Sequence, residues 1–513
     1  MTVNKEVPTS REFQSSSFIA PPPPASLFQG CDTVTGSGIS TAVQGSFVTT
    51  GGISSVVYHV TEDVESLYRA LDISQSISVG FGPFGSVNEK SQFVQNLSLT
   101  THSLNIVVHA KHVKGTDTAN AFRLRDGVSP PSGNEQLKKF FRSYGDSFMS
   151  SLTTGSEYYA VYTFYAQSRE EQLSVKVELA ANGIFDFGTV GGDFQSKIDK
   201  VTKSSHTRIS FSQNVAGIAN PRLPNPNELV AYALAFPSLP IDAPAILSFA
   251  CTGYEHVHEI NDFGPIAKNR DYFLGTNVTP GLATSLAKVV ELKNQLLWME
   301  KLYTFYRGYT GDGKAKEGLE EAKKDELAIN TQIAAFVDDP TATFQRPALL
   351  SLQLGTPILQ YQIVPVAAHG GDGGDPFDDV DINLYLQKQT RISALQLRSG
   401  SEIDKLITSY QDADGNAWTT QHGGGGGGLS QVLTILPGQF VTRIDGRSGA
   451  RVDRLLYTLS DGRTLGGGGN GGSAFDWSAA AADIVLGFSG RSAARLDKIQ
   501  PVVARLQPAK WVK

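Results

Sequence analysis

The chain has 513 residues, of which 18% are charged and 52 are glycine, and its formal net charge is -6. This length exceeds what one compact core supports, so we expect two or three domains. A negative net charge without any basic block gives no reason to expect nucleic acid as a partner. Cys31 and Cys251 are too few for a disulfide framework, and we interpret them as free thiols.

The N-terminal residues 1–28 combine charges, a serine run and four consecutive prolines at 21–24. The segment lacks the apolar core of a signal peptide, and we predict that it forms a flexible tail. No apolar run elsewhere approaches the roughly 20 residues of a membrane-spanning helix. We therefore expect a protein that is soluble when made and is then released or secreted.

Residues 29–345 form the first large region, and its beginning is rich in strand-forming residues. Segments 101–113, 158–165 and 209–213 alternate apolar with polar residues or are dense in aromatic ones, which predicts three β-strands. Further along, the spacing of leucine, valine and isoleucine over 280–338 predicts two helices, with Pro280 at the start of the first. We interpret this helical pair as a packing buttress.

Two polar segments of the first region carry apolar residues at every second position. In the first segment these are Ile77, Val79, Phe81, Leu97 and Leu99; in the second they are Leu173, Val175, Val177 and Leu179. A transmembrane strand needs about 9–11 residues, apolar toward lipid and polar toward the lumen. Each segment is long enough for two such strands, with tips near 83–85 and 188–192. The alternative, ordinary amphipathic strands of a soluble sheet, is disfavoured by the symmetric placement of two such segments.

Between the two segments lies a short motif, with Tyr144, Gly145 and Phe148 followed by Gly155. In type and spacing it resembles the signature of the membrane attack complex/perforin (MACPF) family. Asp146, Ser147 and Ser156 depart from that signature. The last departure concerns how the backbone bends after Gly155, because glycine tolerates unusual dihedral angles.

The resemblance implies an α+β domain, a bent four-stranded antiparallel sheet flanked by helix clusters. In this family the clusters unfold into two membrane-spanning hairpins per subunit once a ring of subunits has assembled. Assembly is required because an open sheet edge cannot exist in hydrocarbon. Small polar residues allow the two segments to form short helices beforehand.

Residues 346–513 contain an internal threefold repeat. Glycine-rich loops occur at 369–374, 422–428 and 466–472, and each precedes a near copy of one phrase, at 398–404, 447–453 and 491–497. Three such units predict a β-structure with pseudo-threefold symmetry. The repeats resemble the jacalin-related lectins, which implies an all-β type I β-prism that binds targets.

In that family, each sugar site pairs a Gly-x-x-x-Asp element with a glycine-rich loop. Carboxylates accept hydroxyl hydrogen bonds, and backbone N–H groups exposed by glycine donate others. Carried over, the resemblance implies three pairings: Gly400 and Asp404 with the loop at Gly423, Gly449 and Asp453 with the loop at Gly468, and Asp497 with the loop at Gly370. Ala493 replaces the glycine of the third element. Alternatively, these residues only shape turns of the prism.

Together the resemblances imply a pore-forming protein, as in lectin-tailed bacterial MACPF proteins that include insecticidal toxins. The expected partners are a cell-surface glycan or receptor, target membrane lipid, and further copies of the chain in a ring. No metal, cofactor or catalytic residue is expected, because no recognisable acid/base pair or nucleophile motif is present. The alternative function is a non-lytic glycan-binding recognition or adhesion protein with a MACPF-like scaffold.

Overall fold

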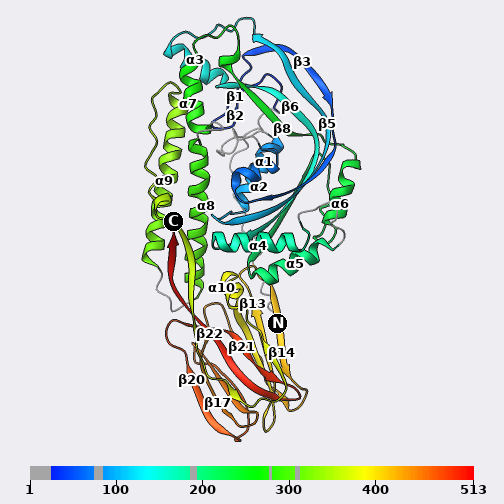
Figure 1. Cartoon of the computed structure of the whole chain (residues 1–513), viewed down its shortest axis with the longest axis vertical. Coiled ribbons are helices and arrows are strands. Elements are labelled where there is room, and N and C mark those ends of the chain that lie inside the picture. The colour runs from blue at the N-terminus through cyan, green and yellow to red at the C-terminus, as the bar shows by residue number, and fades with distance from the viewer. Residues whose placement is uncertain (1–24, 74–84, 185–192, 276–279, 307–311) are drawn as a thin grey trace, which may run out of the picture.

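The computed structural model describes residues 25–73, 85–184, 193–275, 280–306 and 312–513. The molecule is elongated, with a large curved sheet and its helices at one end and three smaller sheets at the other (Figure 1). This arrangement agrees with the predicted mixture of helix and sheet followed by an all-β region. Within the described residues, no helix is both long and apolar enough to cross a membrane.

The large sheet is antiparallel and is built on two long neighbouring strands, β5 (Ser103–Leu124) and β6 (Ser147–Tyr165). Strands β3 and β4 follow one another along the outer edge of β5, and β8 and β7 do the same along β6, so the sheet is essentially four strands wide. The remaining bounds are β1 (Gly30–Asp32), β2 (Ser37–Gly38), β3 (Val43–Gly51), β4 (Ser55–Thr61), β7 (Arg208–Ala216) and β8 (Ala245–Gly253). The three predicted strands are confirmed in β5, β6 and β7.

The sheet bends where the outer strands change over. The pairing of β5 with β6 shifts register between Val113 and Gly115, directly opposite Gly155 of β6. A Cβ added to Gly155 would lie 2.2 Å from the carbonyl oxygen of His112, so only glycine allows β5 and β6 to approach this closely. Ser156 follows, fully buried, and its hydroxyl has no hydrogen-bond partner within the described residues.

In the described part of the chain, seven α-helices lie between β4 and the helical pair. They are α1 (Val64–Ala70), α2 (Gly85–Asn96), α3 (Asn134–Tyr144), α4 (Arg169–Ala181), α5 (Phe194–Ser205), α6 (Leu229–Ala235) and α7 (Gly264–Leu274). Helices α1 and α2 pack inside the curve of the sheet, α4, α5 and α6 lie against its other side, and α3 and α7 lie at the end farthest from the three smaller sheets (Figure 1). Helices α1 and α2 join β4 to β5, and α4 and α5 join β6 to β7. Tyr159 and Val161 of β6 share a core with α1 and α2, whereas Tyr158, Ala160 and Tyr162 face α4, α5 and α6.

The two alternating segments therefore lie mainly in helices. Ile77, Val79 and Phe81, like both predicted tips except Gly85, fall outside the described residues. Leu97 and Leu99 follow α2 and are buried. In α4, Val175 and Leu179 are buried, whereas Leu173 and Val177 are 45% and 66% exposed.

The predicted tail ends earlier than expected. Residues 1–24 lie outside the description, but residues 25–28 are docked rather than loose. Ala25 is buried, the backbone N–H of Phe28 donates to the carbonyl of Met149, and the ring of Phe28 stacks on that of Phe148. The prediction of a flexible tail was wrong for these four residues, because Ala25 and Phe28 bury apolar surface against β6.

The predicted helical pair is confirmed as α8 (Leu282–Phe305) and α9 (Gly313–Asp338). The pair runs beside the large sheet and reaches the near end of the three smaller sheets (Figure 1). Leu282, Leu286 and Val289 pack in the core beneath the large sheet, whereas Leu302 and Tyr306 belong to the core of the C-terminal sheets. Helix α8 thus joins two cores through opposite ends.

The C-terminal region consists of three antiparallel sheets around one apolar core, which together form a prism. Each sheet has an inner hairpin flanked by outer strands: β21–β22, β12–β13 and β17–β18 are the inner pairs. The bounds are β9 (Thr356–Val364), β10 (His369–Gly370), β11 (Asp375–Asp378), β12 (Arg391–Ser399), β13 (Ile403–Gln411), β14 (Ala417–Gly423), β15 (Gly428–Leu429), β16 (Leu433–Thr434), β17 (Val441–Ser448), β18 (Val452–Leu459), β19 (Thr464–Gly468), β20 (Ser473–Ser478), β21 (Asp483–Ser492) and β22 (Leu496–Val512), with one short helix, α10 (Ile382–Gln387).

Candidate functional site

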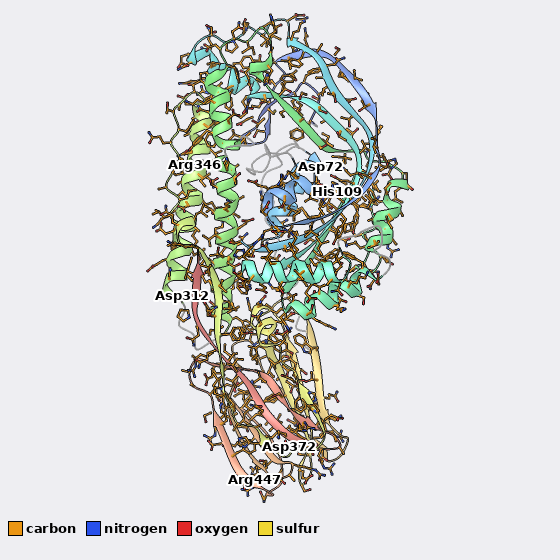
Figure 2. The ribbon with its side chains drawn as sticks, viewed as in Figure 1. Asp72, His109, Asp312, Arg346, Asp372 and Arg447 are labelled. Atoms are coloured by element: carbon orange, nitrogen blue, oxygen red, sulfur yellow. The ribbon has the colours of Figure 1, made fainter. Side chains whose placement is uncertain are left out.

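Each copy of the repeated phrase forms the turn of one inner hairpin. The phrases connect β12 to β13, β17 to β18 and β21 to β22, and each hairpin has a register shift at its end. Each glycine-rich loop connects two outer strands of the same sheet, β14 to β15, β19 to β20 or β10 to β11. Phrase and loop therefore meet at one end of each sheet. Figure 2 shows Asp372 of one loop and Arg447 of one phrase at the end of the prism that lies farthest from the large sheet.

The structure brings together all three predicted pairs of aspartate and glycine loop. A Cβ added to Gly427 would lie 2.4 Å from the carboxylate of Asp404, and one added to Gly472 would lie 2.5 Å from that of Asp453. The same relation holds at 2.6 Å between Gly374 and Asp497. The loops are glycine-rich because any side chain at these positions would occupy the place of the carboxylate.

The glycine that opens each element also lies beside the carboxylate. A Cβ at Gly400 or at Gly449 would stand 3.8 Å from the carboxylate of its aspartate, close to the facing loop. Ala493 places a methyl group at the equivalent position of the third element. The third site therefore carries a methyl group where the other two have only a glycine hydrogen.

One arginine per repeat braces the glycine loop, a role that our sequence analysis missed. Arg398 donates from Nε to the carbonyl of Gly426 at 3.0 Å and from Nη2 to that of Gly427 at 3.2 Å. Arg447 and Arg491 make the same paired contacts with loops 468–472 and 370–374. The planar guanidinium suits two parallel hydrogen bonds, which fixes the loop without any side chain in it. The signal was present in the sequence as the first residue of each phrase.

Comparison with known families agrees with this geometry. Residues 366–501 match the model of the jacalin-like lectin domain. The C-terminal prism is a jacalin-like lectin domain. This domain covers less than half of the chain, and the match does not extend to the large sheet and its helices.

Solved lectin structures resemble between a quarter and a third of the chain. Malaysian banana lectin has 24% sequence identity, covering 29% of this chain and 99% of that one, with a TM-score of 0.24. A mannose-binding jacalin-related lectin from Ananas comosus has 25% identity with the same coverages and TM-score. Artocarpin, solved with mannotriose, has 23% identity, covering 28% of this chain and 97% of that one, again with a TM-score of 0.24. The comparison with curated proteins found no match.

The Tyr144 motif lies where helix α3 ends and strand β6 begins. Gly145 ends the helix with a φ of +83°, and a Cβ there would lie 2.1 Å from the carbonyl oxygen of Cys31. Phe148 is fully buried and packs edge-on against Phe122. The motif therefore sets the start of β6, and Gly155 sets its bend.

Asp146, one of the departures from the signature, is fully buried. Its carboxylate accepts hydrogen bonds from the backbone and hydroxyl of Thr33 at 3.1 and 2.7 Å. Burial raises the pKa of Asp146 to about 7, and the nearby charge of Asp32 adds to the effect. Arg270 on α7 opposes this shift.

A buried ionic network holds α2 against the sheet. The side chains of Lys90, Glu157 and His109 are all 0% exposed. The ammonium of Lys90 lies 3.2 Å from Oε2 of Glu157, and Nε2 of His109 lies 2.8 Å from the same oxygen. Figure 2 shows His109 on the sheet beside Asp72, which is paired with Lys111 at 2.5 Å. Sequence analysis missed this network, because charged residues are rarely buried completely.

A second ionic contact links the two helical segments to each other. Glu62, between β4 and α1, pairs with Arg169 at 2.7 Å and also with Lys176, both on α4. Hydrogen bonds from Lys176 and Arg169 lower the pKa of Glu62 below its usual value. Any movement of α4 away from the end of β4 must break this contact.

Proposed function

We propose that this protein binds glycans on a target membrane through its jacalin-like domain, assembles into a ring and inserts two hairpins per subunit. The inserting segments are residues 70–99 and 169–205, and the activity is that of a pore-forming toxin. The resemblance of the Tyr144 motif to the MACPF signature supports this function. The two helical segments connect neighbouring strands of the sheet, and this placement supports the proposal further.

The observation that carries the proposal is the pairing register of the sheet. Thr61 of β4 pairs with Asn105 of β5, and Ser103 of β5 pairs with Tyr165 of β6, so odd-numbered residues of all three strands share one face. If the helical segments extended these strands in register, the nine alternating apolar residues would all lie on that face. They are Ile77, Val79, Phe81, Leu97, Leu99, Leu173, Val175, Val177 and Leu179.

The length of the helical segments also suits this conversion. Residues 62–102 and 166–207 separate the paired strands, about 40 residues each, and two membrane-crossing strands need about 20. Both segments lie on neighbouring strand pairs, β4–β5 and β6–β7, so the two hairpins would form side by side in one continuous sheet. Burial of one apolar face in lipid would drive insertion, and the edges would be closed by neighbouring subunits.

The position of the lectin domain fits the same direction of insertion. Helices α4 and α5 lie at the end of the large sheet that faces the prism, and Asp372 and Arg447 mark its far end (Figures 1 and 2). A surface bound at the far end of the prism therefore lies in the direction in which β6 and β7 would grow. Glycan binding by the loops would bring this end of the sheet toward the membrane.

The first test is dye release from liposomes made with lipid extracts of candidate target cells, with electron microscopy of the same samples. We expect leakage together with rings. Binding without leakage or rings across several extracts would refute insertion and would support a non-lytic recognition lectin.

A crosslink gives a sharper test of hairpin release. Lys176 lies eleven residues beyond the end of β6, which would place it about 35 Å from Glu62 in an extended strand. We expect a short thiol crosslinker between Glu62→Cys and Lys176→Cys to abolish leakage while leaving membrane binding intact. The uncrosslinked double variant should leak.

The matched control is a crosslink that replaces another lysine–glutamate ion pair, one that lies outside the proposed inserting segments. Lys293 of α8 and Glu326 of α9 lie 2.6 Å apart. Crosslinking Lys293→Cys to Glu326→Cys should leave leakage unchanged. Both double variants also carry Cys31→Ala and Cys251→Ala, so that no other thiol reacts. Equal leakage from the crosslinked and reduced forms of the Glu62–Lys176 variant would contradict release of α4.

A further inference from the structure

The three loop sites of the prism differ in the residue that the neighbouring sheet supplies. Each glycine loop touches the phrase turn of another sheet: a Cβ at Gly424 would lie 2.6 Å from the carbonyl oxygen of Ala494, one at Gly371 would lie 2.5 Å from that of Ala450, and one at Gly469 would lie 2.6 Å from that of Ser401. The contact is therefore the same three times over. The residue that follows the contacting residue is not the same at all three sites: it is arginine at two of them and glutamate at the third.

At two of the sites that arginine lies against the sugar-site aspartate. Nη1 of Arg495 is 2.6 Å from Oδ1 of Asp404, whose side chain is only 3% exposed. Nε of Arg451 is 3.7 Å from Oδ1 of Asp497, whose side chain is 9% exposed. The first contact is an ion pair without hydrogen-bond alignment, so Oδ1 of Asp404 accepts no hydrogen bond within the described residues.

Glu402 holds both arginines in place. Its Oε2 lies 3.2 Å from Nη1 of Arg451 and 3.3 Å from Nε of Arg495. Each guanidinium is therefore shared between Glu402 and one site aspartate. Networks of this kind are stronger than isolated surface pairs, because one side chain is already ordered by the other contact.

The third site lacks an arginine. Asp453 faces the loop 468–472, and the residue supplied there is Glu402, which is turned toward Arg451 and Arg495. In the part of the chain that the structure describes, no ion pair within 4 Å involves Asp453, which is half-buried rather than covered.

The loop at Asp453 also presents an additional polar side chain. Asn470, in the middle of this loop, is exposed. At the equivalent place in loop 370–374, Asp372 is paired with Lys498, and loop 423–427 has only glycine there. Asn470 offers both a donor and an acceptor beside Asp453.

We propose that the Asp453 site is the one that takes sugar in this protein, and that Arg495 and Arg451 are built-in occupants of the other two. The proposal rests on the proposed glycan binding of the domain. A neutral hydroxyl cannot readily displace a guanidinium from a buried carboxylate, because the charged pair is stronger than a neutral–charged hydrogen bond and the guanidinium is also held by Glu402.

The ligand class follows from the charges around the open site. Asp453 accepts two neighbouring hydroxyl groups, and backbone N–H groups of the loop 468–472 donate to the ring or hydroxyl oxygens. The carboxylate of Asp453 has no ion-pair partner among the described residues, so its charge repels a carboxylated sugar. The site therefore takes a neutral hexose and rejects sialic and uronic acids.

The test uses isothermal titration calorimetry of the full chain with the methyl α-D-pyranosides of mannose, glucose and galactose. We expect one site per chain, at least a tenfold loss of affinity in Asp453→Asn, and no change in Asp404→Asn. Arg495→Ala should uncover the Asp404 site, where Gly400 is present, and raise the stoichiometry toward two. Glucuronic acid should not bind.

Several results would overturn the assignment while leaving glycan binding intact. These are a wild-type stoichiometry above one, equal losses in Asp404→Asn and Asp453→Asn, or an Arg495→Ala variant that stays at one site. Absence of binding of all three sugars by the wild type and by Arg495→Ala would instead refute glycan binding through these loops, and the site assignment with it. Circular dichroism of each variant verifies that the prism is folded.

Discussion

Replacing Lys90 by methionine should destabilise the large sheet by about 3–5 kcal/mol, the usual cost of removing one partner from a buried ion pair. The ammonium of Lys90 donates to the carbonyls of Leu71 and Leu247 at 2.9 and 2.5 Å and to Glu157 at 3.2 Å. Methionine has similar length and keeps the apolar packing. The loss is therefore electrostatic, because two buried carbonyls lose a donor. Among the described residues, Oε1 of Glu157 already has no hydrogen-bond partner, and the carboxylate would keep only His109.

The appropriate assay is hydrogen exchange of peptides from β5 and β6, because a chain with several domains does not unfold in one step. A loss of about 3–5 kcal/mol would be a large part of the 5–15 kcal/mol that is typical for a domain. Glu157→Gln alone and the double variant complete a cycle, and the double variant should lose less than the sum of the single changes. A Lys90→Met variant within 1 kcal/mol of the wild type would refute the reasoning.

Three further predictions concern buried or paired groups. Because the fold raises the pKa of Asp146 to about 7, the wild type loses stability as pH rises toward 7 and this carboxyl group ionises. The free energy of unfolding of Asp146→Asn, measured relative to the wild type by thermal unfolding, should therefore increase between pH 5 and 7, by at most about 1.4 kcal/mol per pH unit. The lowered pKa of Glu62 has the opposite sign, so Glu62→Gln should cost about 0.5–1 kcal/mol at pH 7 and nothing well below pH 4.5, and an equal cost at both pH values would contradict the ion pair with Lys176. The sulfur atoms of Cys31 and Cys251 lie 2.9 Å apart, so mild oxidation should form a disulfide that raises the free energy of unfolding by up to about 5 kcal/mol. Peptide mass spectrometry would detect the disulfide, and thiols that stay free after oxidation would contradict the prediction.

The prism could be predicted from the sequence because its motifs occur three times. Each phrase and each loop recur three times in the same order, so the pairs formed by Asp404, Asp453 and Asp497 with glycine loops followed from one family resemblance. The roles of Arg451 and Arg495 did not follow. They depend on which turn meets which loop when three sheets close around one core, and local sequence does not contain that relation.

Only part of the large sheet could be predicted from the sequence. Its long strands have strong β patterns, and the aromatic-rich segment 158–165 lies in β6, with Tyr158 and Tyr159 buried on opposite faces of the sheet. The burial of Lys90 and Glu157 could not be predicted in this way, because sequence patterns assign charged residues to the surface. Only the close packing of α2 on the sheet turns them into a buried pair.

The sequence of α4 fits two conformations, and the structure explains only half of its apolar residues. As a helix, α4 buries Val175 and Leu179, four positions apart, and leaves Leu173 and Val177 in solvent. As an extension of β6 it would place all four on one face.

The partner segment α5 completes this argument. Tyr165 of β6 pairs with Arg208 of β7, so in an extended hairpin the face that holds Val175 and Leu179 would continue through even-numbered residues of the returning strand. Those residues include Phe194 and Ile198, which would stand opposite Leu179 and Val175, with Lys200 nearer the strand base, where a long cationic side chain reaches the lipid headgroups. On the opposite face of the returning strand, the odd-numbered residues from 193 to 205 would be polar except at Val201. A soluble helix does not need the alternation of apolar residues from Leu173 to Leu179 in α4, and the proposed hairpin insertion would account for it.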